Sequence, residues 1–287
     1  MSSQVQTVYL NGEFLPIDQA RVSVMDRGFL FGDGVYEVIP VYGGRPLRLD
    51  EHLERLDASL KGIGMVSPLN REQWQAIFEQ LIAGPEDQSI YLQVTRGYAP
   101  KRDHAFPSVV QPTIFVMCNP IAAIPASGVA AITLDDTRWQ FCNIKAVTLL
   151  ANVLLKQEAV EHGAAEALLV RDGHVLEGSS SNVFVLLDGM LITPPKGHQL
   201  LPGITRDLVL ELAARHGIPY VERHITLDEL RSADEVWVTS STREVLPVVT
   251  LDGVTVGTGV PGALWERMNA LYQDYKIELR HAHAGGR

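Results

Sequence analysis

The feature that most limits the fold of this chain is a stretch from His104 to Leu134 without a single Lys, Arg, Asp or Glu. Its length suggests a membrane-spanning helix, which needs about 20 continuous apolar residues. Prolines break the stretch and exclude such a helix: Pro107, Pro112, Pro120 and Pro125. The pattern instead predicts two buried strands, at about 113–118 and 129–134, with a linker between them.

This linker divides the 287 residues into two parts, in keeping with a usual domain size of about 150 residues. We expect a smaller N-terminal domain over 1–120, a linker over 121–127 and a larger C-terminal domain over 128–287. Strands and amphipathic helices are mixed in both parts without a strict βαβ order. This mixture predicts the α+β class.

Helices are predicted where apolar residues recur every three or four positions. Asp50 is a candidate cap for a helix that ends at Gly62, and a second helix is expected to begin at Asn70. A third helix over 148–162 is expected to turn four apolar side chains inward: Leu149, Leu150, Val153 and Leu154.

The composition is that of an ordinary globular protein, with 46% hydrophobic and 20% charged residues. A net charge of −10 argues against non-specific nucleic-acid binding, but it leaves room for a local basic pocket. The two cysteines, Cys118 and Cys142, form no disulfide framework and no C-x-x-C pair. We also see no signal peptide, so we expect a cytoplasmic protein without membrane or nucleic-acid partners.

Lysine is scarce, with six residues in the chain, and Lys145 stands apart because it lies between Ile144 and Ala146. Burial lowers the pKa of an amine and makes it a nucleophile at neutral pH. The alternative is a lysine that extends from the edge of a core while its ammonium stays in water. Local context alone leaves both interpretations open.

A second candidate is the segment VLEGSSSNVF, in which Glu177 ends a predicted strand and precedes Gly178 and three serines. A carboxylate at this place can hold a cationic ring nitrogen, and the serines offer hydrogen-bond donors. The alternative is an ordinary polar connection between strands. A serine-hydrolase elbow is not expected, because it requires the pattern G-x-S-x-G.

Two segments are candidates for binding an anion. In LLPGITRD, the first free amides of a predicted helix belong to Ile204 and Thr205, and a helix N-terminus attracts anions. In VTSSTREV, a buried strand opens into hydroxyl groups: Ser240, Ser241 and Thr242. The alternative for the first segment is an ordinary helix start that binds no anion, and for the second segment it is an ordinary turn.

Three further residues carry groups that bind carboxylates or phosphates. Arg55 lies on the predicted helix after Asp50, and Arg102 and His104 are two positions apart in the segment KRDHAFP. A guanidinium beside an imidazole can bind a carboxylate through two hydrogen bonds. The alternatives are a surface arginine and a solvated loop.

Taken together and in order, these segments resemble the fold-type IV pyridoxal-phosphate transaminases, most closely the bacterial D-amino-acid (D-alanine) aminotransferases. The similar strings run from Asp26 to about Pro247: FGDGVYEV, EHLERL, VTRG followed by RDHAFP, NIKAVTLLANVL, LEGSSSNVF, LPGITRD and VTSSTRE. The resemblance implies a two-domain α+β architecture with a cofactor cleft between the domains.

The resemblance also implies catalytic roles for three residues. Lys145 would form the Schiff base with pyridoxal 5'-phosphate and carry protons, Glu177 would pair with the pyridine nitrogen, and Tyr36 would face the substrate. Arg55 and the helix start would bind the phosphate. The other implied cofactor contacts are Ser180, Ser181, Asn182, Leu201, Ile204, Thr205, Ser240, Ser241 and Thr242.

Arg102 and His104, with Tyr36, match the trap for the substrate carboxylate, on a loop that the family takes from a neighbouring subunit. This chain has an additional residue, Lys101, before Arg102, and Arg243 is a further candidate to project toward the pocket. Lys145 would deliver the proton to only one face of the planar intermediate. The side on which the substrate carboxylate is held therefore decides which enantiomer forms.

The resemblance implies transamination between D-amino acids, such as D-alanine or D-glutamate, and 2-oxo acids by a homodimer, with no metal site. The first alternative is a branched-chain L-amino-acid aminotransferase, which would leave Arg102 and His104 without a role. A 4-amino-4-deoxychorismate lyase is the second. A non-catalytic phosphate-ligand binding protein is the third, and it would have no need of Lys145.

Overall fold

The computed structural model describes residues 5–125 and 127–281, and its contacts divide the chain into two compact units. Unit 1 comprises the described residues up to Ile121 together with Ile144–Thr148, and unit 2 comprises those of Ala122–Asn143 and Leu149–His281. The first boundary falls at the start of the predicted linker, of which residue 126 lies outside the described residues.

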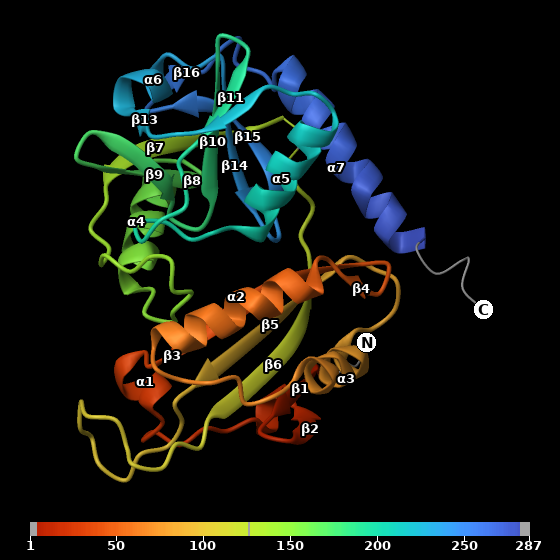
Figure 1. The fold of residues 1–287 in the computed structure, drawn as a ribbon, viewed down its shortest axis with the longest axis vertical. Helices are drawn as coiled ribbons and strands as arrows, with labels where there is room; N and C mark the ends of the chain where they lie inside the picture. Colours follow the sequence, from red (N-terminus) through yellow and green to blue (C-terminus); the bar gives the residue numbers. More distant parts are fainter. Residues whose placement is uncertain (1–4, 126, 282–287) are drawn as a thin grey trace. The chain divides into compact units, whose positions relative to one another are not determined.

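Unit 1 is built on a six-stranded sheet with the order β2-β1-β6-β5-β3-β4, in which every pairing is antiparallel. Figure 1 shows the sheet with α2 and α3 beside it. Its elements are β1 (Thr7–Leu10), β2 (Glu13–Pro16), the 3₁₀ helix η1 (Ile17–Gln19), α1 (Arg27–Phe31), β3 (Gly34–Tyr42), β4 (Arg45–Pro46), α2 (Leu49–Gly62), α3 (Arg71–Leu81), β5 (Gln88–Thr95) and β6 (Thr113–Pro120).

The core of unit 1 lies between the two longer helices and one face of the sheet. Alternate residues of β3, such as Val35 and Ile39, pack with Leu56 of α2 and Trp74 of α3 in one apolar cluster. Because side chains alternate along a strand, Glu37 shares this face and Tyr36 points to the opposite one.

The first long helix begins differently from the prediction. Its N-cap is Arg48, in the left-handed conformation and without a capping side chain, whereas Asp50 lies in the first turn and pairs with Arg71 at 2.5 Å. The acidic first turn still stabilises the positive end of the helix dipole. Asn70 does cap the next helix, through a capping box with Gln73.

The segment Ile144–Thr148 belongs to unit 1, although its position in the sequence placed it in the predicted C-terminal domain. It adds to the free edge of β3: Val35 and Ala146 form an antiparallel bridge, and the Val147 amide donates to the Gly34 carbonyl at 3.0 Å. Backbone pairing between residues more than 100 positions apart leaves no local sequence pattern, which is why the prediction missed it.

Unit 2 contains a ten-stranded mixed sheet, with the order β12-β11-β10-β14-β15-β7-β8-β9-β13 and β16 paired to β15. Its elements are β7 (Val129–Asp135), α4 (Leu150–Glu161), β8 (Glu166–Arg171), β9 (His174–Gly178), β10 (Asn182–Leu187), β11 (Met190–Thr193), α5 (Ile204–Arg215), β12 (Tyr220–Glu222), β13 (Ile225–Thr226), α6 (Leu227–Arg231), β14 (Glu235–Ser240), β15 (Glu244–Leu251), β16 (Val254–Thr255) and α7 (Ala263–His281).

The orientation of α4 corrects the prediction for the helix over 148–162. Leu155 and Ala159 pack against β7 and β8, whereas Leu150, Val153 and Leu154 are 71%, 57% and 61% exposed in the single chain. Apolar residues occur on most sides of this helix, so their spacing did not identify the buried side.

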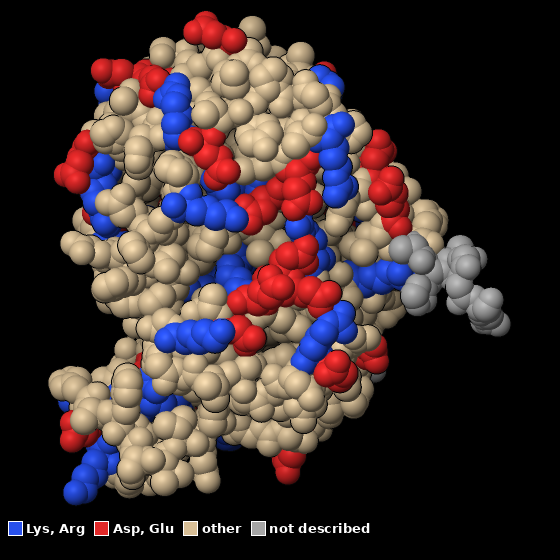
Figure 2. All heavy atoms as spheres, viewed as in Figure 1, with Lys and Arg blue, Asp and Glu red and all other residues tan. Residues whose placement is uncertain are grey.

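No helix among the described residues is long and apolar enough to cross a membrane. The uncharged stretch instead supplies β6 and β7, as expected. On the face shown in Figure 2, acidic and basic side chains lie next to one another in many places.

The capping box of α3 predicts a measurable contribution to stability. We expect Asn70→Ala to lower the free energy of unfolding by about 1 kcal/mol, because the Gln73 amide loses its acceptor. Urea unfolding followed by circular dichroism measures this. Gln80→Ala, at an exposed position of the same helix, is the control and should change stability by less than about 0.5 kcal/mol. Equal effects of the two substitutions would contradict the role of the cap.

Candidate active site

Unit 1 brings Lys145 and Tyr36 together. The Tyr36 amide donates to the Lys145 carbonyl at 2.9 Å, and the Lys145 Nζ lies 4.2 Å from the centre of the Tyr36 ring. The Lys145 amide donates to the Ser59 hydroxyl of α2 at 3.1 Å. Backbone contacts on both sides therefore fix this half-buried amine over an aromatic face, where a cation is favoured.

Beside this pair, a polar stripe of α2 faces Glu37, which is fully buried. Arg55 donates to both carboxylate oxygens at 2.7 Å, and His52 Nδ1 lies 2.8 Å from the same carboxylate. Burial opposes ionisation, but Arg55 and His52 hold the pKa of the Glu37 carboxyl well below its usual range. Glu37 therefore carries a charge that orients the Arg55 guanidinium.

His52 has one nitrogen left for another group. Burial lowers the pKa of its imidazole, so the neutral ring donates from Nδ1 to Glu37 and keeps Nε2 as an acceptor. That Nε2 is buried and has no hydrogen-bond partner among the described residues. Buried polar atoms are normally paired, so this one keeps an unused capacity to accept a hydrogen bond.

The loop with Arg102 and His104 is exposed in the single chain but well anchored. Arg27 donates to the carbonyls of Asp103, His104 and Ala105 at 2.6, 3.2 and 3.2 Å. The Arg102 guanidinium lies 5.0 Å from the centre of the Phe31 ring, and the His104 ring is 5.3 Å from the same ring. The structure thus brings these two side chains together on one aromatic residue.

In unit 2, Glu177 lies at the end of β9 and is buried. Its carboxylate accepts from Arg138 at 2.5 Å, from the Leu201 amide at 3.0 Å and from the Asn182 side chain at 3.3 Å. Burial raises the pKa of this carboxyl to about 7, against the opposing effect of Arg138. A cationic group next to the Glu177 carboxylate would stabilise its ionised form, which burial deprives of hydration.

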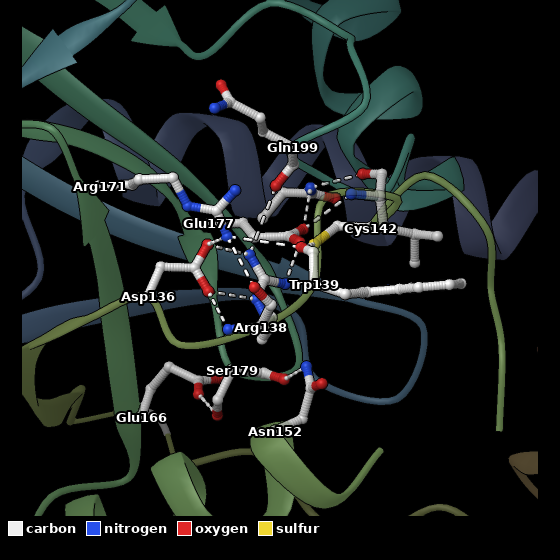
Figure 3. A network of polar contacts seen from close by, with 12 residues as sticks. Asp136, Arg138, Trp139, Cys142, Asn152, Glu166, Arg171, Glu177, Ser179 and Gln199 are labelled. Carbon is white, nitrogen blue, oxygen red and sulfur yellow. Dashed lines mark hydrogen bonds and ion pairs between the residues drawn. The ribbon is translucent and has the colours of Figure 1, made fainter. Parts of the chain in front are cut away.

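Arg138 holds Glu177 from a rigid position (Figure 3). One edge of its guanidinium bonds Asp136 at 2.9 and 3.0 Å, while Nη1 reaches Glu177. Arg171 donates to Oδ2 of the same Asp136 carboxylate at 2.9 Å. Two carboxyl groups and two guanidiniums thus form one hydrogen-bonded network around Glu177.

The hydroxyls of the three serines after Glu177 all contact the carboxylate of Glu166. Ser180 and Ser181 donate to it at 3.2 and 2.9 Å, and Ser179 contacts it too. Figure 3 shows the contact between Ser179 and Glu166. Arg243, a candidate to project toward the pocket, is also bonded to Glu166.

The predicted anion site begins where α5 starts. The first backbone hydrogen bond of this helix runs from the Asp207 amide to the Gly203 carbonyl at 3.0 Å. The amides of Ile204 and Thr205 therefore have no acceptor inside the helix. Gly203 is required because a Cβ there would lie 1.9 Å from the Asn182 side-chain oxygen. Asn182 in turn donates to the Leu201 carbonyl at 2.8 Å.

Next to this helix start, β14 leads into the turn with Ser240, Ser241 and Thr242. Thr239, which pairs with Asn182 across the sheet, is buried and its hydroxyl has no partner among the described residues. It is a second unpaired buried atom, and it lies directly before the predicted phosphate-binding hydroxyls.

Five of these residues were missed by the sequence prediction: Glu37, His52, Arg138, Glu166 and Thr239. Buried charged residues need partners, but their partners lie on other elements and are not visible in a single sequence. No group of three or more His, Cys, Asp or Glu among the described residues is arranged to hold a metal ion.

Glu37 and Glu177 predict opposite effects of pH on the stability of the cofactor-free protein. Because the pKa of Glu37 is depressed from 4.5, its contribution is present above about pH 4.5 and is lost as the pH falls. Because the pKa of Glu177 is raised from 4.5 to about 7, its contribution declines as the pH rises through that window.

Urea unfolding between about pH 3 and 8 measures both effects. We expect Glu177→Gln to flatten the decline toward neutral pH, and Glu37→Gln to flatten the acid-side loss while costing about 3 kcal/mol at pH 7. Each variant serves as the control for the other. Identical pH profiles of the two variants would contradict these assignments.

Comparisons with known proteins agree over nearly the whole chain. The family described as Amino-transferase class IV matches residues 34–251. A D-alanine aminotransferase of Bacillus licheniformis is 42% identical over 272 residues, 93% of this chain and 96% of that protein.

Solved structures give the same result. A branched-chain aminotransferase of Thermoproteus uzoniensis with norvaline has a TM-score of 0.86 and 26% identity, covering 98% of this chain and 97% of that one. A hypothetical aminotransferase of Mycobacterium tuberculosis in its PLP-bound form has a TM-score of 0.82 and 25% identity, covering 95% and 99%. The predicted fold and enzyme class are confirmed, and the chain belongs to the class IV aminotransferases of fold type IV.

Proposed function

We propose that this aminotransferase moves amino groups between D-amino acids, of the D-alanine or D-glutamate type, and 2-oxo acids, with pyridoxal 5'-phosphate as cofactor. The observation that carries the proposal is Lys145, whose half-buried amine is fixed over the Tyr36 ring. The similarity to a D-alanine aminotransferase and to a PLP-bound structure supports the substrate class and the cofactor.

The residues present fit this cofactor. A phosphate dianion requires hydrogen-bond donors and positive charge, which the first amides of α5, the hydroxyls after β14 and Arg55 offer. Two buried polar atoms without partners, His52 Nε2 and Thr239 Oγ1, leave hydrogen-bonding capacity for a bound group.

Pyridoxal phosphate, when bound, supplies an electron-accepting ring that stabilises negative charge at the substrate Cα. Glu177 would hold a proton on the ring nitrogen, and its bond to Arg138 at 2.5 Å keeps the carboxylate aimed. The Lys145 Nζ would hold the cofactor through its aldehyde and would serve as the base for the proton on the substrate Cα.

We propose that Arg102 and His104 bind the substrate carboxylate, and that the site is completed by a second copy of the chain. Apolar side chains exposed in the single chain support a homodimer, since large exposed apolar areas mark interfaces. They include Phe29 on α1 and Leu150, Val153 and Leu154 on α4. A cytoplasmic location remains an expectation from the cysteine content.

A branched-chain L-amino-acid aminotransferase is the second candidate. The similarity to the Thermoproteus uzoniensis structure with norvaline supports it. The anchored position of Arg102 and His104, both against Phe31, favours the D-amino-acid reaction.

The cofactor proposal predicts a yellow protein. We expect Lys145→Ala to abolish the visible absorption of the bound cofactor, because the amine that binds the aldehyde is gone. Lys61→Ala, at the exposed end of α2, is the matched control and should keep the band. Absorption spectra after incubation with excess cofactor measure this, and a colourless wild type would disprove the proposal.

The substrate proposal predicts turnover of D-alanine with 2-oxoglutarate and much slower turnover of L-leucine. We expect Arg102→Ala to raise KM for D-alanine about tenfold or more, because a charged hydrogen bond to the carboxylate is lost. Arg21→Ala, an exposed arginine bonded to its neighbouring carbonyl, is the control. Faster turnover of L-leucine by the wild type would favour the branched-chain reaction.

A further inference from the structure

We propose that Glu166 and Arg243 act as positioning residues that tie together two loops of the cofactor site in unit 2. One loop is Ser179–Asn182, which follows Glu177, and the other is the turn Ser240–Thr242, which follows β14. The inference rests on the proposed function, because only that function makes both loops part of one site.

Glu166 is the buried centre of this arrangement and has no exposed side-chain area. Its carboxylate accepts from the hydroxyls of Ser179, Ser180 and Ser181 and from the Ala167 amide at 3.1 Å. Asn152 of α4 holds the same loop from the other side, through the Ser179 carbonyl at 2.8 Å. The serine loop is therefore oriented by one carboxylate.

Arg243 brings the second loop to that carboxylate. Its Nη2 bonds Glu166 and also contacts the Ser180 hydroxyl at 3.0 Å, and its Nη1 is 3.4 Å from the Ala165 carbonyl. Glu244, the next residue, has a positive φ of 52° and is held by Lys276 at 2.5 Å. The end of the turn is thus held by the contacts of Arg243 and of Glu244.

The charges explain why Arg243 acts through the loop and not on a phosphate. Burial opposes ionisation of Glu166, but Arg243 and the serine hydroxyls keep the pKa of its carboxyl below its usual range. The Nη2 of Arg243 is therefore engaged by Glu166 and by the Ser180 hydroxyl, within the loop.

Binding of pyridoxal 5'-phosphate and of pyridoxal, which lacks the phosphate, to the cofactor-freed protein distinguishes the two roles. We expect Arg243→Gln to weaken both ligands by about tenfold, because both loops lose their support. Glu166→Gln should weaken both by a similar factor, and the double variant should be no worse than either single one.

A direct phosphate contact would give a different result. Arg243→Gln would then weaken pyridoxal phosphate but not pyridoxal, and Glu166→Gln would leave binding unchanged or tighten it. Either result, or affinities unaffected by both substitutions, would overturn the proposal.

Two further variants serve as controls for this experiment. Arg243→Lys keeps a positive charge beside Glu166 and should restore affinity to within about threefold of the wild type, even where Glu166→Gln fails to fold. Arg215→Gln, at an exposed position of α5, should change nothing. A wild type that binds neither ligand would overturn the proposed function as well, whereas a wild type that binds both with unaffected variants would overturn only the link between the loops.

Discussion

The structure depends on the pairing of Ile144–Thr148 with the edge of β3. The hydrogen bond from the Tyr36 amide to the Lys145 carbonyl sets the amine on the face of the sheet that carries Tyr36. The core helices occupy the opposite face. Together with the hydrogen bond from the Lys145 amide to Ser59 of α2, this pairing holds the lysine in unit 1.

A buried carboxylate stands behind most of the candidate cofactor residues. Glu37 orients Arg55, Asp136 orients Arg138, and Glu166 orients the serine loop. Ionised side chains are costly to bury without partners, so each pairing restricts both members to one geometry. Preorganised charges of this kind suit a reaction in which charge develops on the substrate.

Local structure was predicted from the sequence because its causes are local. Asn70 caps α3, and the uncharged stretch supplies β6 and β7. The placement of Lys145 in unit 1, the exposed side of α4 and the partners of the serine hydroxyls depend on residues distant in the chain. The family resemblance identified the candidate residues, but not the carboxylates that orient them.

The close approach of Gly203 to Asn182 couples the two ends of the cofactor region of unit 2. Asn182 bonds Leu201, and both donate to Glu177. A single methyl group added where α5 starts would displace Asn182, and with it the carboxylate of Glu177. The start of α5 and the position of Glu177 therefore cannot vary independently during evolution.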